Sequence, residues 1–139
     1  MEYTISTNNI EDAEDLFIVA KERLLDINDW HSTHKFTLTD GHQHKVQRNA
    51  HKGDFIMKSG FPNERYIINK IQYDDYPDIA GESITVFMAD VSDAESMQSV
   101  SINRTGKLLS VLGHNLDFLG NAQDFLKGLI SSNEYAIAS

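Results

Sequence analysis

Hydrophobic spacing at the start of the chain predicts a short strand followed by a helix. Residues 3–6 alternate between apolar and polar side chains, which is typical of a strand. Asn8 and Asn9 can each cap the helix that follows, and acidic residues fill its first turn, where they favour the positive end of the helix dipole. The next apolar positions recur at spacings of three and four, so we expect one buried helix face. These positions are Ala13, Leu16, Phe17, Ala20, Leu24 and Ile27.

After this helix comes a short turn that ends near Trp30, and the hydrophobic period then changes to two. Residues 36–39 alternate, and the pair Asp40-Gly41 predicts a hairpin turn whose return strand covers residues 44–48. Gly53 predicts a bend before the apolar positions that follow. If residues 44–58 form one long strand bent at Gly53, six strands lie between the two helical parts of the chain; if they form two strands, there are seven.

The middle of the chain carries further strand patterns. Alternation over residues 66–73 predicts Ile67, Ile71 and Tyr73 on one side of the strand, with Tyr66 and Ile68 on the other. Residues 74–83 are rich in acidic side chains, and we expect them to form a connection between strands. Residues 84–91 are apolar on both faces, as expected of a central strand. The last predicted hairpin joins residues 100–102 to residues 108–112 through a turn at 104–106.

A second helix is predicted to close the chain, with Asn121 as its cap. Its apolar stripe consists of Phe118, Ala122, Phe125, Leu126, Leu129 and Ile130. The whole chain has 139 residues, of which 40% are hydrophobic, and this length suits a single domain over residues 1–139. The expected fold is α+β: a bent antiparallel sheet of about six or seven strands that grips the C-terminal helix, with an N-terminal helix.

Charge and composition exclude several classes of function. Twelve basic residues against 21 acidic ones give a net charge of -9, which repels nucleic acid and anionic membrane surfaces. No cysteine is present, so disulfides, thiolate zinc sites and thiol nucleophiles are excluded. The first residues resemble no signal peptide, and no stretch is long and apolar enough to span a bilayer. We expect a cytoplasmic protein with no nucleic-acid or membrane partner.

The sequence contains few groups that suggest a catalytic or metal-binding site. Five of the six histidines lie between His31 and His51, and the predicted return strand would put His42 and His44 on one face. A metal site needs a third ligand, so we interpret the cluster as an exposed, partly cationic edge and expect neither metal nor cofactor. The acidic residues around position 92 lack the pattern of a calcium loop. Groups left open as an acid or base are His31, His34, Asp54, Tyr73 and Tyr76.

The order of these elements resembles the START-like, or helix-grip, superfamily, which includes polyketide cyclase and Bet v 1 relatives. The likeness begins with residues 3–6, the helix after them and Asp29-Trp30-His31. A second resemblance is to a group of uncharacterised bacterial cytosolic proteins of similar length, and it covers roughly the last 90 residues. It rests on residues 53–56, 101–106, 113–115 and 126–129. The chain departs from that group in the loop over residues 59–63.

The helix-grip resemblance implies an apolar cavity between the sheet and the closing helix. Its implied lining residues are Trp30, Phe36, Phe55, Met57, Phe87, Met88, Phe118 and Phe125. Aromatic and methionine side chains at such spacings are more often ordinary core. We favour a non-enzymatic binder of a small apolar or amphipathic molecule in this cavity; the alternatives are a cyclase- or hydrolase-like enzyme with an acid or base at the cavity mouth, and an interaction module with a filled core. The last includes a homodimer joined through sheet edges or the closing helix.

Overall fold

The computed structural model of the chain describes residues 2–30, 35–60, 64–114, 121–130 and 137–138. Within these ranges the elements follow the predicted order of strand, helix, six strands and helix, and a two-residue strand follows. The strands are β1 (Glu2–Thr7), β2 (Phe36–Thr39), β3 (Phe55–Lys58), β4 (Arg65–Tyr76), β5 (Gly81–Asp90), β6 (Asp93–Thr105), β7 (Leu108–His114) and β8 (Ile137–Ala138). The helices are α1 (Ile10–Leu24) and α2 (Ala122–Ile130), with short 3-10 helices η1 (Ile27–Asp29) and η2 (Pro77–Ile79).

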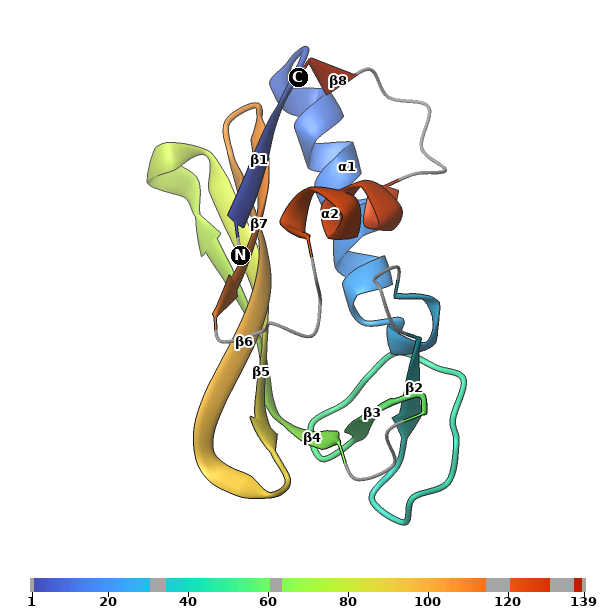
Figure 1. Cartoon of the computed structure of the whole chain (residues 1–139). Helices are drawn as coiled ribbons and strands as arrows, with labels where there is room; N and C mark the ends of the chain where they lie inside the picture. Colours follow the sequence, from blue (N-terminus) through green and yellow to red (C-terminus); the bar gives the residue numbers. More distant parts are fainter. Residues whose placement is uncertain (1, 31–34, 61–63, 115–120, 131–136, 139) are drawn as a thin grey trace.

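All of the described strands belong to one antiparallel sheet. Its order is β2-β3-β4-β5-β6-β7-β1-β8, so β5 lies in the middle as expected, and β1 closes onto the last hairpin. The sheet curls, and both α-helices lie on its concave side (Figure 1). The predicted fold class is therefore confirmed: an α+β domain with a bent antiparallel sheet of helix-grip type, an N-terminal helix and a C-terminal helix.

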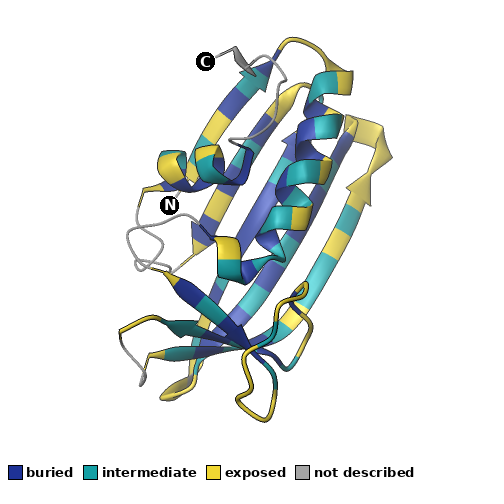
Figure 2. Ribbon diagram, turned by 90° about the vertical axis from the view of Figure 1, so that its right-hand side faces the viewer, coloured by how far each residue is buried: buried dark blue, intermediate teal, exposed yellow. Residues whose placement is uncertain are grey.

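Helix α1 begins where the sequence predicts, because the Oδ1 atom of Asn9 accepts a hydrogen bond from the backbone N–H of Asp12 at 2.8 Å. Its predicted apolar positions are all buried. α1 runs along the strands, and the shorter α2 lies beside it over β1 and β7 (Figure 2). The N-terminal helix thus covers more of the concave face than the closing helix does, and both helices contribute to one apolar core with the sheet.

The predicted return strand over residues 44–48 is wrong, and so is the long bent strand over 44–58. β2 pairs with β3, while residues 44–48 contribute only an isolated bridge between Thr39 and Lys45. The segment holds a single apolar residue, Val46, so it has no apolar face to bury against the core. Gly53 does form the expected bend, with a φ of 92°.

The side chain of Asn28 holds this loop against the outer edge of β2. Its Oδ1 atom accepts a hydrogen bond from the backbone N–H of Leu38 at 3.0 Å, and its Nδ2 atom donates to the carbonyl of Val46 at 2.8 Å. The backbone N–H of Val46 donates in turn to the carbonyl of Leu38 at 3.1 Å. The backbone of Leu38 that faces away from β3 is therefore paired within the chain.

The predicted faces of β4 are wrong in their second half because the strand contains an irregularity at Asn69. The register pairs Ile68 with Met88 but Ile71 with Val86, so one residue of β4 has no partner between them. Such a bulge shifts the alternation by one position. Ile71 and Tyr73 consequently share the concave face with Ile68, and Ile67 faces outward on its own.

The hairpin between β4 and β5 is tighter than the acidic connection expected over residues 74–83. β4 extends to Tyr76, and β5 already begins at Gly81. A Cβ atom at Gly81 would lie 3.0 Å from the carbonyl oxygen of Arg104, which explains a glycine at this close approach of two strands. Within the described ranges, the helices are all too short or too polar to cross a membrane.

Candidate functional site

The structure divides the predicted lining residues between the two faces of the sheet. Trp30, Phe36, Met88 and Phe125 are at least 95% buried on the concave side. The ring of Trp30 meets the rings of Phe36 and Phe125 edge to face, with centroids 5.6 and 5.5 Å apart. Its indole N–H donates to the carbonyl of Leu24 at 3.0 Å. Trp30, directly after η1, therefore packs against a ring of β2 and a ring of α2.

Three other predicted lining residues lie on the outer face of the sheet. Phe55 and Met57 flank the fully buried Ile56 along β3, and Phe87 lies between two fully buried residues of β5. Successive side chains of a strand point to opposite faces, so these three point away from the helices and are half-buried. Phe118 lies outside the described residues. The seven described residues of the predicted lining are therefore divided between the two faces and do not surround one space.

A polar group that the sequence reasoning missed lies on the concave face. Gln98 on β6 is 8% exposed and is paired in register with Met88. Its Oε1 atom is buried and has no hydrogen-bond partner in the structure that the described residues form. A buried acceptor without a donor is costly and calls for a specific explanation. The alternation that places Val100 and Ile102 in the core also places Gln98 there, so the sequence held this signal.

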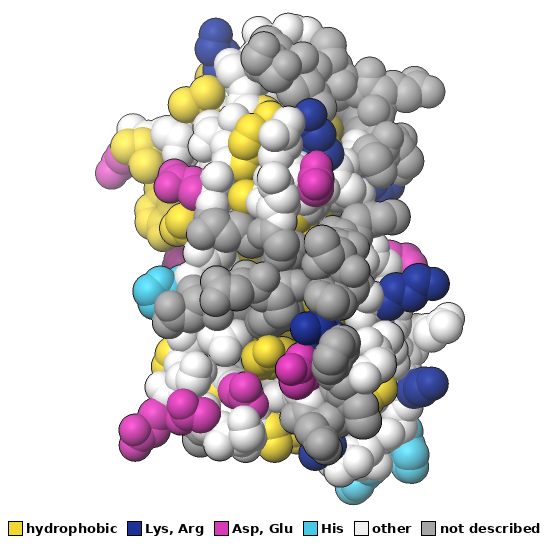
Figure 3. Space-filling model, in the orientation of Figure 1, with side chains coloured by type: hydrophobic (Ala, Val, Ile, Leu, Met, Phe, Trp, Pro, Cys, Tyr) yellow, Lys and Arg dark blue, Asp and Glu magenta, His cyan; other side chains and the backbone are white. Residues whose placement is uncertain are grey.

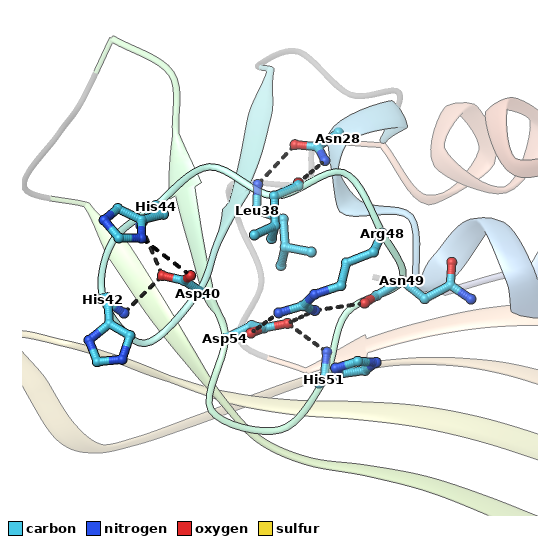
Figure 4. Close-up of polar contacts among 10 residues, drawn as sticks. Asn28, Leu38, Asp40, His42, His44, Arg48, Asn49, His51 and Asp54 are labelled. Atoms are coloured by element: carbon cyan, nitrogen blue, oxygen red, sulfur yellow. Dashed lines mark hydrogen bonds and ion pairs between the residues drawn. The ribbon is translucent and has the colours of Figure 1, made fainter.

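The histidine-containing loop between β2 and β3 is polar and exposed (Figure 4). Asp40 Oδ1 accepts hydrogen bonds from the backbone N–H groups of His42 and His44, both at 2.9 Å. These bonds, that of His44 first, lower the pKa of Asp40. His42 and His44 lie in this turn and not on a strand, with ring centroids 6.3 Å apart. His31 and His34 lie outside the described residues.

An ion pair fixes the second half of the same loop. Arg48 donates from Nη1 and Nη2 to the two carboxylate oxygens of Asp54, at 2.6 and 3.0 Å. The backbone N–H of His51 also donates to Asp54, at 2.7 Å. Burial acts to raise the pKa of Asp54, but the bonds from Arg48 and His51 outweigh it, and the pKa is lowered. Asp54 therefore holds the loop as a carboxylate and is a poor candidate for a general acid.

This lowered pKa predicts an acid-sensitive contribution to stability. A carboxyl group whose pKa is lower in the folded state stabilises the fold above its unfolded pKa, and that stabilisation is lost as the pH falls through the folded pKa. Urea unfolding of the wild type and of Asp54→Asn should therefore differ at pH 7, and the difference should shrink below about pH 4. A difference that stays constant down to pH 3 would contradict the assigned role of Asp54.

Beside the loop lies a polar pocket of about 260 Å³. It is lined by Asp26, Asn28, Asp29, Gln47, Arg48 and Asn49. Burial, followed by the hydrogen bond and the charge of Asp29, raises the pKa of Asp26. The pocket lies at the outside of the η1 turn and not between the sheet and α2. The one cationic side chain in this lining, Arg48, is already paired with Asp54, and the other lining side chains are two carboxylates and three amides.

Of the ionisable groups that were left open as catalysts, the described ones, Asp54, Tyr73 and Tyr76, are not gathered into one site. Tyr73 donates from its hydroxyl to Glu82 at 3.1 Å, and burial, together with this contact, raises its pKa. It lies on β4, whereas Asp54 belongs to the loop that precedes β3. Within the described ranges, no three side chains of His, Asp or Glu are grouped as metal ligands would be. On the face shown in Figure 3, acidic and basic side chains are interspersed.

Comparisons of the chain with family models, curated proteins and solved structures gave no match. The function must therefore be argued from the geometry of these groups. Two features depart from what a minimal two-layer domain requires: the buried Gln98 acceptor on the concave face, and the apolar side chains on the outer face.

Proposed function

We propose that the chain is a non-enzymatic binder of a small amphipathic molecule, held on the concave face of the sheet, which the two helices cover. The observation that carries the proposal is the buried Oε1 atom of Gln98, which has no hydrogen-bond partner in the described structure. Its direct neighbour in register is Met88, one of the implied lining residues. The proposal includes a cytoplasmic location and kinship with helix-grip proteins, both of which rest on the sequence patterns.

The chemistry of Gln98 defines the ligand class. A buried carbonyl oxygen in apolar surroundings is satisfied by one hydroxyl or N–H donor. Met88 and Val100, both fully buried, supply apolar surface beside it. Methionine adapts its shape readily to different ligands. The ligand is therefore an apolar body with one hydrogen-bond donor, seated against Met88 and Gln98.

The charge of the protein restricts the class of ligand further. The net charge of -9 gives the whole molecule a field that repels anions. Gln98 itself carries no charge that would balance an ionised ligand. An uncharged alcohol or amide therefore fits better than a fatty acid or a phosphorylated compound. The catalytic alternative has less support, since the candidate acids and bases in the described part of the chain, Asp54, Tyr73 and Tyr76, do not gather at this place.

The substitution Gln98→Leu separates ligand binding from ordinary core packing. It removes the unpaired acceptor at similar volume, so the ligand-free protein should become more stable, by about 1 kcal/mol in urea unfolding. Native mass spectrometry of freshly purified wild-type protein should show a copurified small molecule, and the variant should lack it. Titration with 1-decanol, an uncharged amphipathic probe, should likewise give weaker binding to the variant.

The matched control is Gln72→Leu, the same substitution on β4. Gln72 donates to Asp74 at 2.7 Å and is only half-buried, so its loss should change neither the bound molecule nor the binding of 1-decanol. Equal binding of the probe by wild type and Gln98→Leu would refute the proposal. So would a wild-type protein that carries no adduct and binds no probe.

A further inference from the structure

The second half of β4 forms an open edge of the sheet. β3 pairs with β4 only over residues 65–67, and Ile68 then bonds to the loop that precedes β3. Residues 70–76 continue along β5 in unbroken register. Within the described ranges, no strand pairs with the other side of residues 70–76. An edge of this length is a template on which a further strand can pair.

The hydrogen bonds of Ile68 show which backbone groups point to this edge. Its N–H donates to the carbonyl of Asp54, and its carbonyl accepts from the N–H of Gly53, so both groups point away from β5. Pairs of an antiparallel ladder alternate between hydrogen-bonded and non-hydrogen-bonded. The partners two and four positions along β5 from that of Ile68 therefore form the same kind of pair. These are the partners of Ile71 and Tyr73, whose N–H and C=O groups consequently point to the open edge.

Apolar side chains lie exposed beside this edge on the concave side. Tyr73 is 50% exposed, its ring lies 6.4 Å from that of Phe17 on α1, and Nζ of Lys21 lies over it at 5.4 Å. Ile18 is 49% exposed and precedes Lys21 by three residues, so the two are neighbours on α1. The edge thus combines backbone groups that can pair with apolar surface beside them, as sites of strand addition do.

We propose that two copies of this chain associate edge to edge, through antiparallel pairing of residues 70–74 with Gln72 of both copies at the two-fold axis. Ile71 of one copy and Tyr73 of the other then form a hydrogen-bonded pair, twice in the dimer, and the two sheets become continuous. Two-fold dimers are the commonest homo-oligomers. The proposal goes beyond ligand binding on the concave side and does not depend on it.

Charge complementarity along β4 selects a second copy as the occupant and fixes the register. With Gln72 at the axis, Lys70 of each copy lies opposite Asp74 of the other, in the non-hydrogen-bonded pairs whose side chains are closest. These side chains share the outer face with Gln72, which donates to Asp74 at 2.7 Å. A shift of two residues in either direction would place Gln72 opposite Asp74 or Lys70 and would lose both ion pairs. The segment is therefore complementary to itself in one register.

The first test measures self-association by sedimentation velocity over a range of concentrations at about 0.15 M salt, where the repulsion between the two net charges is screened beyond about 8 Å. The wild type should form a dimer. Lys70→Asp and Asp74→Lys should each raise the dissociation constant about 10-fold, because each places like charges opposite one another at two positions. The double variant, in which both charges are exchanged, should recover the wild-type dissociation constant.

The matched control for the charge changes is Lys127→Asp. Lys127 is exposed on α2, away from β4, so this variant should dimerise as the wild type does. A wild type that stays monomeric up to about 100 μM would leave the edge to a strand of another protein and would overturn the proposal. So would single variants that dimerise as well as Lys127→Asp, or a double variant no tighter than the single ones.

The second test needs no substitution and examines the backbone directly. Amide hydrogen exchange followed by NMR reports protection residue by residue. The N–H groups of Ile71 and Tyr73 should exchange quickly in dilute protein and should become protected as the concentration rises through the dissociation constant. The N–H of Gln72, which belongs to a hydrogen-bonded pair with β5, should be protected at every concentration. Rapid exchange of Ile71 and Tyr73 in a solution that sedimentation shows to be dimeric would place the contact elsewhere and overturn the proposal.

Discussion

Replacement of Phe125 by alanine should lower the free energy of unfolding by about 3 to 5 kcal/mol. Phe125 is 1% exposed and meets the ring of Trp30 edge to face, with centroids 5.5 Å apart. It is the largest fully buried side chain of α2, and Gly128 lowers the intrinsic stability of this helix. The docking of α2 thus depends on side-chain packing, which this substitution removes.

Urea unfolding of purified variants measures this effect directly. Lys127→Ala is the matched control, because Lys127 lies on the exposed side of the same helix and alanine favours helix formation. Its free energy of unfolding should stay within about 0.5 kcal/mol of the wild type. A loss below about 1 kcal/mol for Phe125→Ala would mean that α2 does not dock through this ring.

Glu82→Ala is expected to cost about 3 kcal/mol, because it leaves a buried guanidinium without its counterion. Arg104 is 7% exposed, and its Nε and Nη2 atoms lie 2.8 and 2.7 Å from Oε2 of Glu82. Its Nη1 atom donates to the carbonyls of Ala80 and Gly106, which fixes its position. The side chain therefore cannot turn to solvent without breaking the hairpin contacts.

The appropriate comparison for Glu82 is its cross-strand neighbour Asp75. The two residues are directly paired in register, and like charges placed opposite one another are unfavourable. Asp75→Ala should therefore be neutral or slightly stabilising in thermal and urea unfolding. Equal losses for the two variants would show that the Arg104 pair contributes no more than any acidic residue of this hairpin.

The alternation and helix signals were sufficient to predict most of the fold. Asn9 and Asn121 cap the helices as expected, and the turn at 104–106 joins β6 to β7 with Gly106 at a φ of 58°. These features succeed because a cap or a turn depends on a few neighbouring residues. The order of the sheet then follows from consecutive hairpins.

The errors arose where distant parts of the chain decide the local structure. Residues 44–48 look like a return strand, but Asn28, from the turn after α1, holds them as a loop. The bulge at Asn69 leaves no clear mark in the sequence and reverses the faces of every later residue in β4. The predicted lining residues were recognised as apolar. Which face of the sheet each of them occupies depends on which alternate positions of its strand point toward the helices. Gln98 could have been found from the spacing to Val100.

The contacts of Asn28 also bear on the resistance of this protein to aggregation. An edge strand whose backbone N–H and C=O groups are unpaired can add strands from other molecules, and repeated addition leads to fibrils. At β2 the amide and carbonyl of Leu38 are already occupied by Asn28 and Val46. Asn28, from a turn distant in sequence, therefore blocks the addition of another strand at Leu38 on this sheet edge.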